Sequence, residues 1–356
     1  TDLFVSNNEN GNISRYSVTG DSLVTYMTTT TAAEGIYYDA TADMVYQASR
    51  SDLQLEAFAD INTLIDGDAI TSSFTGAADL ESPRELAVNG SSFVVADNGS
   101  NKFFVYENTG SGFTLMNTVE VPFPVWGITF KGDDLYAVVD TTGDLAVYYD
   151  FLSNANSAIL RPSKRVTIEG IVRTHGITYD GTDDVMVLTD IGDATDANTD
   201  GGFHVISEFS SKFDALSDGE LLPIGMQVRV AGSSTLMGNP IDVAYDSETD
   251  AVYVAEIGNG LYATSTANGD VSIYDGSGML TKTVATGSDA TEGIYYDAFN
   301  DAIIQASRSG LALEFYGSFS AVTDLANIAA DFSGSAELPS PREIAVFGNK
   351  VVVSSN

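Results

Sequence analysis

The residues best suited to chemistry lie in one acidic run, residues 190–202, which reads Asp-Ile-Gly-Asp-Ala-Thr-Asp-Ala-Asn-Thr-Asp-Gly-Gly. Alternating oxygen-bearing side chains converge on a hard cation such as Ca2+, and a glycine permits the sharp turn that this requires. The sequence therefore predicts a calcium loop, with a solvated acidic turn as the alternative. The candidate ligands are Asp190, Asp193, Asp196, Asn198 and Asp200.

The elements that position these residues follow from a repeat in the chain. Residues 34–51 and 292–309 both contain Glu-Gly-Ile-Tyr-Tyr-Asp and Gln-Ala-Ser-Arg-Ser, and the offset of 258 holds without a gap from Thr1/Asn259 to Asn98/Asn356. Weaker copies lie between them. Each copy begins with a short apolar strand, followed by an acidic turn and a second apolar strand. The first strands start near Ile36, Leu86, Ile128, Ile177, Val243, Ile294 and Ile344.

Four strands in each unit of about 40 to 50 residues are typical of β-propeller blades. We therefore predict an all-β fold, a single propeller domain over residues 1–356 with seven four-stranded blades, six or eight being the alternatives. The predicted blades span about 36–85, 86–127, 128–176, 177–242, 243–293 and 294–343, and a closing blade joins 344–356 to 1–35. Helical periodicity is nearly absent. Ser320–Ala330 is one helical candidate, but the matching residues 62–72 contain Gly67 and read as a loop.

Both chain ends supply a candidate second strand for the closing blade. Leu3-Phe4-Val5-Ser6 and Val351-Val352-Val353-Ser354 match the same part of the repeat, although one blade needs only one such strand. A misjudged blade boundary, or a fragment of a longer repeat array, is one explanation. The other is that the spare strand pairs with a neighbouring molecule, because strand addition to a sheet edge is a known mode of assembly.

The repeated phrase also resembles a known group of proteins. The stretch Asp242-Val-Ala-Tyr-Asp-Ser-Glu-Thr-Asp-Ala-Val-Tyr-Val-Ala-Glu is similar to the blades of YVTN- and NHL-type propellers, and the resemblance covers essentially the whole chain. It implies the propeller fold. It leaves the function open, since such propellers include binding modules, scaffolds, hydrolases and lactonases.

In a propeller the first strand of each blade lines the central channel, so two sets of side chains are expected at one channel mouth. The strand-start ring, two residues before each first strand, contains Glu34, Arg84, Trp126, His175, Ile241, Glu292 and Arg342. The strand-end ring, at the end of each second strand, contains Asn7, Ser49, Asp97, Asp140, Asp190, Glu256 and Ser307. From these we predict the ligand-binding residues Arg84, Trp126, His175, Arg342, Asp97, Asp140 and Glu256. Alternatively, the arginines pair with neighbouring glutamates and Trp126 plugs the channel.

Charge limits the partners. Fifty acidic residues face fifteen basic ones, and the net charge of −35 disfavours nucleic acid and anionic membranes. No apolar stretch is long enough to span a membrane, and the absence of cysteine excludes disulfides and thiolate sites. One basic cluster, Arg161, Lys164, Arg165 and Arg173, suits an acidic surface such as a second copy of the chain, with ordinary surface charge as the alternative.

These patterns favour a non-enzymatic propeller, extracellular or on the cell surface, with a structural, adhesive or binding role. Self-assembly and stabilisation by Ca2+ are part of this prediction, and the sequence is interpreted as a mature chain whose signal peptide is not present. No nucleophile elbow, zinc-protease motif or phosphate-binding glycine loop occurs. The alternatives are a hydrolase or lactonase with a metal-assisted site formed by Glu34, Glu292 and His175, and a soluble ligand-binding propeller.

Overall fold

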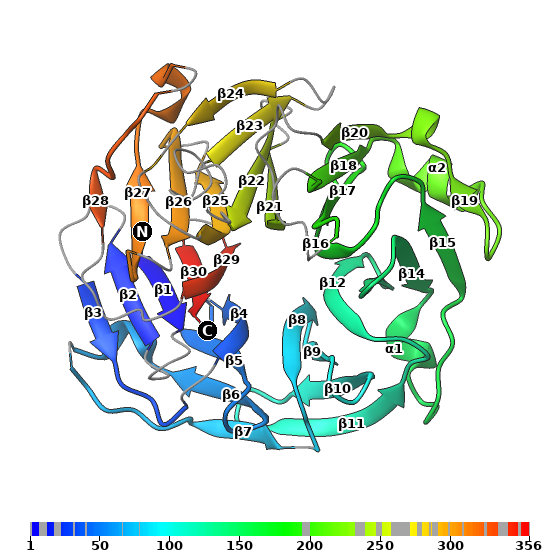
Figure 1. The fold of residues 1–356 in the computed structure, drawn as a ribbon. Coiled ribbons are helices and arrows are strands. Elements are labelled where there is room, and N and C mark those ends of the chain that lie inside the picture. The colour runs from blue at the N-terminus through cyan, green and yellow to red at the C-terminus, as the bar shows by residue number, and fades with distance from the viewer. Residues whose placement is uncertain are drawn as a thin grey trace.

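The computed structural model is an all-β propeller in which the sheets surround a central axis (Figure 1). The described residues are 2–6, 13–17, 23–30, 33–39, 41–65, 67–77, 79–193, 200–231, 239–246, 251–257, 271–275, 280–284, 286, 291–297, 300–307, 310–323, 326–333, 341–347 and 350–355. Within these residues no helix is long and apolar enough to cross a membrane.

Five of the sheets formed by the described residues have four strands. One contains β4 (Ala33–Asp39), β5 (Met44–Ser49), β6 (Gln54–Ala59) and β7 (Phe74–Ala77). The next contains β8 (Pro83–Asn89), β9 (Ser92–Asp97), β10 (Lys102–Asn108) and β11 (Phe113–Glu120). A third contains β16 (Thr174–Asp180), β17 (Val185–Asp190), β18 (Gly202–Ile206) and β20 (Val228–Ala231). The others contain β21 (Asn239–Asp246), β22 (Ala251–Ile257), β23 (Val271–Asp275) and β24 (Leu280–Val284), and β25 (Thr291–Asp297), β26 (Ala302–Ser307), β27 (Ala312–Tyr316) and β28 (Phe332–Ser333).

Two further sheets of the described structure have five strands. One contains β12 (Val125–Lys131), β13 (Asp134–Val139), β14 (Asp144–Tyr148), β15 (Lys164–Ile168) and β19 (Leu221–Leu222), which pairs in parallel with β15. The other joins the chain ends in the order β29 (Pro341–Phe347), β30 (Lys350–Ser355), β1 (Asp2–Ser6), β2 (Ile13–Ser17) and β3 (Leu23–Tyr26). The prediction of seven four-stranded blades is therefore wrong, since five sheets have four strands. Both candidate second strands at the chain ends lie in one sheet.

The described helices are short. They are α1 (Phe151–Asn154), α2 (Phe209–Asp214) and the 3-10 turns η1 (Ile61–Thr63), η2 (Ile224–Met226) and η4 (Phe319–Ala321). The helical candidate Ser320–Ala330 does not form a helix over that range, because among its described residues the helical turn ends at Ala321, in agreement with the loop expected from the matching residues 62–72. The apolar residues there, including Val322 and Ile328, instead pack against the cluster around Ile303 and Tyr316.

The second strand of a blade is buried on both faces because a neighbouring sheet covers each face. All six residues of β5, of β17 and of β26 are buried, which explains why these strands read as continuous apolar runs instead of alternating ones. Apolar clusters fill the space between adjacent sheets, such as that of β9 and β10 with β12, β13 and β14. Burial of this kind is the main stabilising contribution to the fold.

The repeated Tyr-Asp phrase builds the turn between the first and second strands. Asp39 Oδ1 accepts hydrogen bonds from the backbone N–H groups of Thr41 and Ala42 at 2.8 and 3.0 Å, which closes the turn. Asp43 has a φ of 53° and accepts a hydrogen bond of 3.2 Å from the Tyr38 hydroxyl. Tyr179 and Tyr296 make the same bond to Asp184 and Asp301, at 3.0 and 3.1 Å. This phrase is therefore structural, which accounts for its recurrence along the chain.

The first strand of each sheet is innermost. β4, β8, β12, β16, β21, β25 and β29 each contact the next in this order, and β29 contacts β4 (Figure 1). The start of each first strand and the end of each second strand therefore lie at the same end of the ring, because the two strands are antiparallel. The candidate site lies at this end.

Candidate site at one end of the propeller ring

Every position of the strand-start ring coincides with a β-bulge. The ladder register shifts between Pro83 and Leu86, between Val125 and Ile128, and between Thr174 and Ile177, and the other innermost strands have the same irregularity. A bulge re-aims the side chain of its extra residue away from the regular ladder. Arg84, Trp126 and His175 occupy these bulges on three consecutive blades. The structure describes only the backbone of the other strand-start positions Glu34, Ile241, Glu292 and Arg342, and of Glu256 in the strand-end ring. Asn7 of the strand-end ring lies outside the described residues.

Arg84, Trp126 and His175 form one layered stack. The rings of Trp126 and His175 are stacked, with centroids 3.8 Å apart and an interplanar angle of 28°. The Arg84 guanidinium carbon lies 4.3 Å from the centroid of the Trp126 ring, within the range of a cation–π contact. All three side chains are partly exposed. Since β8 and β16 flank β12, the two partners of Trp126 come from the two neighbouring blades.

Gly127 allows the stack to form. A Cβ atom on Gly127 would lie 2.6 Å from the His175 carbonyl oxygen and 2.9 Å from Ile177 Cγ2, distances that real Cβ atoms do not show. Glycine at this position therefore lets the bulge of β12 approach the bulge of β16 closely. Sequence reasoning did not assign this role to Gly127.

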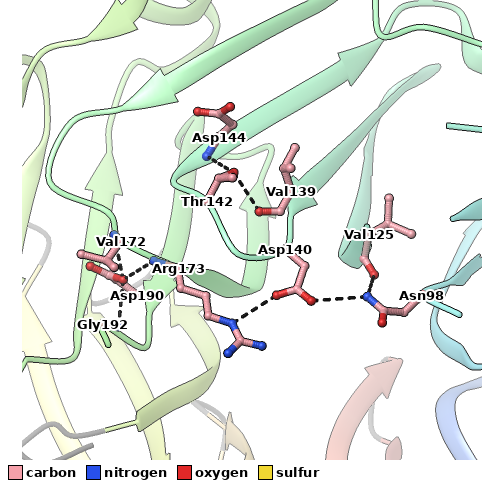
Figure 2. A network of polar contacts seen from close by, with 10 residues as sticks. All are labelled: Asn98, Val125, Val139, Asp140, Thr142, Asp144, Val172, Arg173, Asp190 and Gly192. Carbon is pink, nitrogen blue, oxygen red and sulfur yellow. Dashed lines mark hydrogen bonds and ion pairs between the residues drawn. The ribbon is translucent and has the colours of Figure 1, made fainter. Parts of the chain in front are cut away.

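A polar network crosses the same three blades beside the stack (Figure 2). Arg173 Nε donates to Asp140 Oδ1 at 3.2 Å, and Asn98 Nδ2 lies 3.4 Å from Asp140 Oδ2. Asn98 Nδ2 also donates to the Val125 carbonyl oxygen at 2.8 Å, next to Trp126. The network joins the end of β9 to the start of β12, and the end of β13 to the segment just before β16. Arg173 was predicted as part of a surface patch, but it belongs to this network, and the role of Asn98 was missed.

Asp97, a predicted ligand-binding residue, holds the loop before β8. Its carboxylate is fully buried and accepts the backbone N–H groups of Glu81 and Ser82 at 2.8 and 3.0 Å. The other oxygen accepts the backbone N–H and the hydroxyl of Ser100, both at 2.8 Å. Both oxygens are therefore used inside the fold.

Asp190 has the equivalent role before β16. It is fully buried, and its Oδ1 accepts the N–H groups of Val172, Arg173 and Gly192 at 3.1, 2.9 and 3.0 Å (Figure 2). Burial raises the pKa of Asp190, and the three backbone hydrogen bonds partly oppose that increase. Its Oδ2 is buried without a hydrogen-bond partner among the described residues.

The described part of the acidic run is compact around Gly192. Asp200 Oδ2 accepts the backbone N–H of Asp193 at 2.5 Å, while Asp200 Oδ1 is buried without a described hydrogen-bond partner. Gly192 has a φ of +63°, and a Cβ there would lie 2.4 Å from the Asp200 carboxyl carbon. Asp196 and Asn198 lie outside the described residues. Among the residues that are described, no group of three or more His, Asp or Glu side chains is arranged to hold a metal ion.

The predicted basic patch is divided among separate contacts. Lys164 is 5% exposed, and its ammonium donates to the carbonyl oxygens of Phe213 and Leu216 at 2.5 and 3.1 Å, at the end of α2. Burial lowers the pKa of Lys164. Arg165 Nε lies 2.5 Å from Asp144 Oδ2, whereas Arg161 is exposed. Lys164 is thus part of the interior and is not available to a partner, because it joins α2 to β15.

His204 is buried in the middle of a sheet. Its Nδ1 lies 2.7 Å from Gln227 Oε1, and Gln227 Nε2 donates to the Glu169 carbonyl oxygen at 2.9 Å. This arrangement places the imidazole proton on Nδ1 and leaves Nε2 as a buried acceptor without a partner among the described residues. Burial lowers the pKa of His204 to about 4, the hydrogen bond to Gln227 partly opposes this, and the charge of Arg229 lowers it further.

Comparison with known proteins supports the fold. No protein-family model and no curated protein sequence matches the chain. The structure is similar to that of a proposed 6-phosphogluconolactonase from Bacteroides fragilis, with a TM-score of 0.63, 12% identity and coverage of 89% of this chain and 90% of that one. The structure is also similar to virginiamycin B lyase from Staphylococcus aureus, with a TM-score of 0.60, 12% identity and coverage of 91% of each chain. A computationally designed protein has a TM-score of 0.56 and 12% identity, with coverage of 98% of this chain and 88% of that one. At these identities the likeness concerns the propeller fold alone.

Proposed function

We propose that this chain is a non-enzymatic binding propeller and that the stack of Arg84, Trp126 and His175 is its ligand platform. The observation that carries the proposal is the position of the stack. A guanidinium, an indole and an imidazole occupy the bulges of three consecutive innermost strands, and all three side chains are partly exposed. The resemblance to YVTN- and NHL-type blades fits a binding module of this kind.

The chemistry of the platform favours a flat, negatively charged ligand. A guanidinium that stacks on an aromatic ring uses its face for that contact, and the N–H donors in its plane are suited to a carboxylate. The indole and imidazole supply rigid flat surfaces. The overall charge of −35 opposes an anion at long range, but salt screens that field beyond about 8 Å at physiological ionic strength, so charged groups within that distance, among them the Arg84 guanidinium, determine the local field.

The predicted carboxylates support binding in preference to turnover. A general acid or base must reach the proton that it transfers. Asp97 and Asp190 are instead fully buried and hold backbone N–H groups, and Asp140 bridges Arg173 and Asn98. These groups stabilise the end of the ring on which the platform stands.

Equilibrium dialysis tests this proposal with benzoate and its uncharged isostere benzamide as probes. We expect the wild type to bind benzoate more tightly than benzamide, and Arg84→Gln to weaken benzoate binding about tenfold or more, since charged hydrogen bonds contribute roughly 1.5–3 kcal/mol. Arg165→Gln is the matched control, because Arg165 pairs with Asp144 on another part of the blade. Equal binding of the two probes, or equal effects of the two variants, would refute the proposal.

The proposed setting is extracellular or at the cell surface, with Ca2+ as a stabilising ion in residues 190–202. The acidic composition and the lack of cysteine suit that setting. The unpartnered oxygens Asp190 Oδ2 and Asp200 Oδ1, on either side of Gly192, support a cation there. Addition of Ca2+ to chelator-treated protein should raise the thermal midpoint, and Asp200→Asn should remove the increase. An unchanged midpoint in the wild type would contradict the calcium proposal.

The alternative is a hydrolase or lactonase, an activity that the name of one similar structure, the proposed 6-phosphogluconolactonase, gives for that protein. Its support is positional, because Glu34 and Glu292 occupy the same bulge position as His175. Hydrolysis of a lactone panel that is lost in both Glu34→Gln and Glu292→Gln, with unchanged folding, would favour this alternative. Lack of turnover by the wild type would leave the binding proposal in place.

A further inference from the structure

Three oxygen atoms beside the start of β16 are buried without a hydrogen-bond partner among the described residues. They are Thr174 Oγ1, Asp190 Oδ2 and Asp200 Oδ1. Thr174 and Asp190 are only 1% and 0% exposed, so bulk water does not solvate their side chains. A buried oxygen without a partner costs free energy, and three such atoms together indicate a bound group that supplies the missing interactions.

The three oxygens belong to one corner of the blade. Thr174 and Asp190 are directly paired across the β16–β17 ladder, so their side chains lie on the same face of the sheet. Gly192 brings the two carboxylates together, because its backbone N–H donates to Asp190 Oδ1 at 3.0 Å and a Cβ on it would lie 2.4 Å from the Asp200 carboxyl carbon. Glycine at this position therefore allows the Asp200 carboxylate to approach the end of β17 closely.

The chemistry of these atoms suits a hard cation. Two carboxylates and a hydroxyl are oxygen ligands of the kind that Ca2+ prefers. The other oxygens, Asp190 Oδ1 and Asp200 Oδ2, already accept backbone N–H groups, so one oxygen of each carboxylate remains for the cation. The positive charge of Arg229 also acts on Asp190, but the Arg229 side chain is exposed and solvent weakens its effect.

A short, fixed segment connects this corner to the ligand platform. Asp190 Oδ1 accepts the N–H groups of Val172 and Arg173 (Figure 2). Thr174 follows directly in the chain and precedes His175, the ring of which forms one end of the stack. Asp190 and Thr174 are therefore positioning residues, because they hold the backbone that carries His175.

We propose that a cation bound by Thr174 Oγ1, Asp190 Oδ2 and Asp200 Oδ1 positions His175 in the stack and thereby raises the affinity of the platform for a flat anion. The cation holds Asp190 and Thr174 in one arrangement, and these two residues fix the start of β16. Since coupling between two binding sites is reciprocal, the anion raises the affinity for the cation by the same factor. The effect on anion affinity rests on the proposed function of the platform, whereas the effect on the stack does not.

Tryptophan emission of the full chain, titrated with Ca2+ after treatment with chelator, tests the effect on the stack without any anion, because Trp126 is the single tryptophan. Thr174→Val removes the hydroxyl with little change in shape. Thr167→Val is the matched control, since the Thr167 hydroxyl donates to Asp144 at 2.7 Å on another part of the blade. Equilibrium dialysis of benzoate, with and without saturating Ca2+, measures the coupling to the anion.

We expect Ca2+ to cause a saturable change in emission in the wild type and in Thr167→Val, and Thr174→Val should need at least severalfold more Ca2+ for half of the change. Saturating Ca2+ should tighten benzoate binding to the wild type about fivefold or more. Constant emission of the wild type would overturn the proposal, whether or not Ca2+ raises the thermal midpoint. Equal Ca2+ dependence in the two threonine variants, or benzoate binding that is independent of Ca2+, would overturn it as well.

Failure of the platform as a binding site gives a different result. If benzoate does not bind, but Ca2+ changes the emission and does so less readily in Thr174→Val, the proposed function fails while the control of the stack by the cation stands. If benzoate binds equally well with and without Ca2+ and the emission stays constant, the proposed function stands and the coupling to the cation is refuted.

Discussion

The buried His204 makes a quantitative prediction about acid stability. The perturbation is a change from pH 7 to pH 4.5 in the wild type and in His204→Asn, whose amide keeps a donor near the position of Nδ1. The pKa of His204 is about 4 in the folded chain and about 6.5 in the unfolded chain. Between these values the unfolded state binds more protons, so the free energy of unfolding falls as the pH falls.

The magnitude follows from this difference. One pKa unit corresponds to about 1.36 kcal/mol, and the difference of roughly 2.5 units gives a loss of about 2.5 kcal/mol between pH 7 and pH 4.5, most of the full effect. Arg229 lies beside the ring and opposes its protonation, while Gln227 holds the Nδ1 proton. Since His204 is fully buried, solvent screening does not reduce the effect.

Urea unfolding at the two pH values measures the effect. Carboxylates titrate in the same range, so the informative quantity is the loss of stability in the wild type minus the loss in His204→Asn. We expect that difference to be about 2.5 kcal/mol, whatever the cost of the substitution at pH 7. Equal losses in the two proteins would refute the assignment of a buried, neutral His204.

Three further substitutions test other parts of the fold. Glu56 is 1% exposed and burial raises its pKa, while the side-chain amides of Gln47 and Gln54 donate to its carboxylate, each at 2.9 Å. In urea unfolding, the free energy of unfolding of the wild type relative to Glu56→Gln should therefore rise between pH 7 and pH 4, whatever the substitution costs at pH 7; an unchanged difference would contradict the raised pKa. Lys164→Met should destabilise the chain by roughly 1–3 kcal/mol in thermal or urea unfolding, since it removes the ammonium that donates to the Phe213 and Leu216 carbonyl oxygens; no loss of stability would contradict the interior role of Lys164. Gly127→Ala should lower the thermal midpoint and shift the Trp126 emission, because the added Cβ meets the backbone of the next blade; an unchanged spectrum would contradict the close approach.

The sequence allowed the strands and their register to be predicted because the repeat carries its own turn chemistry. Tyr-Asp followed four residues later by Asp closes the same turn in several blades, so the innermost strands could be aligned from the phrase alone. The same alignment brought Arg84, Trp126 and His175 into one set, and the structure stacks them. The bulges explain this success, since they occur at the same repeat position in every innermost strand.

Contacts between distant segments could not be predicted in this way. Asp97 and Asp190 look like ligand-binding carboxylates in the sequence, but both accept backbone N–H groups from loops that lie 15 to 18 residues earlier. In the sequence Lys164 looks like an ordinary surface charge. In the structure it is covered by α2, which lies about 50 residues later in the chain. The parallel pairing of β1 with β30 also joins segments that lie far apart in the sequence, and the pattern of a single blade does not encode it.

The most direct test of the proposed platform is a titration of the intact chain with benzoate, followed by tryptophan emission. Because the chain contains one tryptophan, the emission reports on Trp126 and therefore on the stack with Arg84 and His175. We predict a saturable change in emission with benzoate that matches the affinity from dialysis, and little change with benzamide. Constant emission at concentrations where dialysis detects bound benzoate would place the ligand elsewhere and contradict the account.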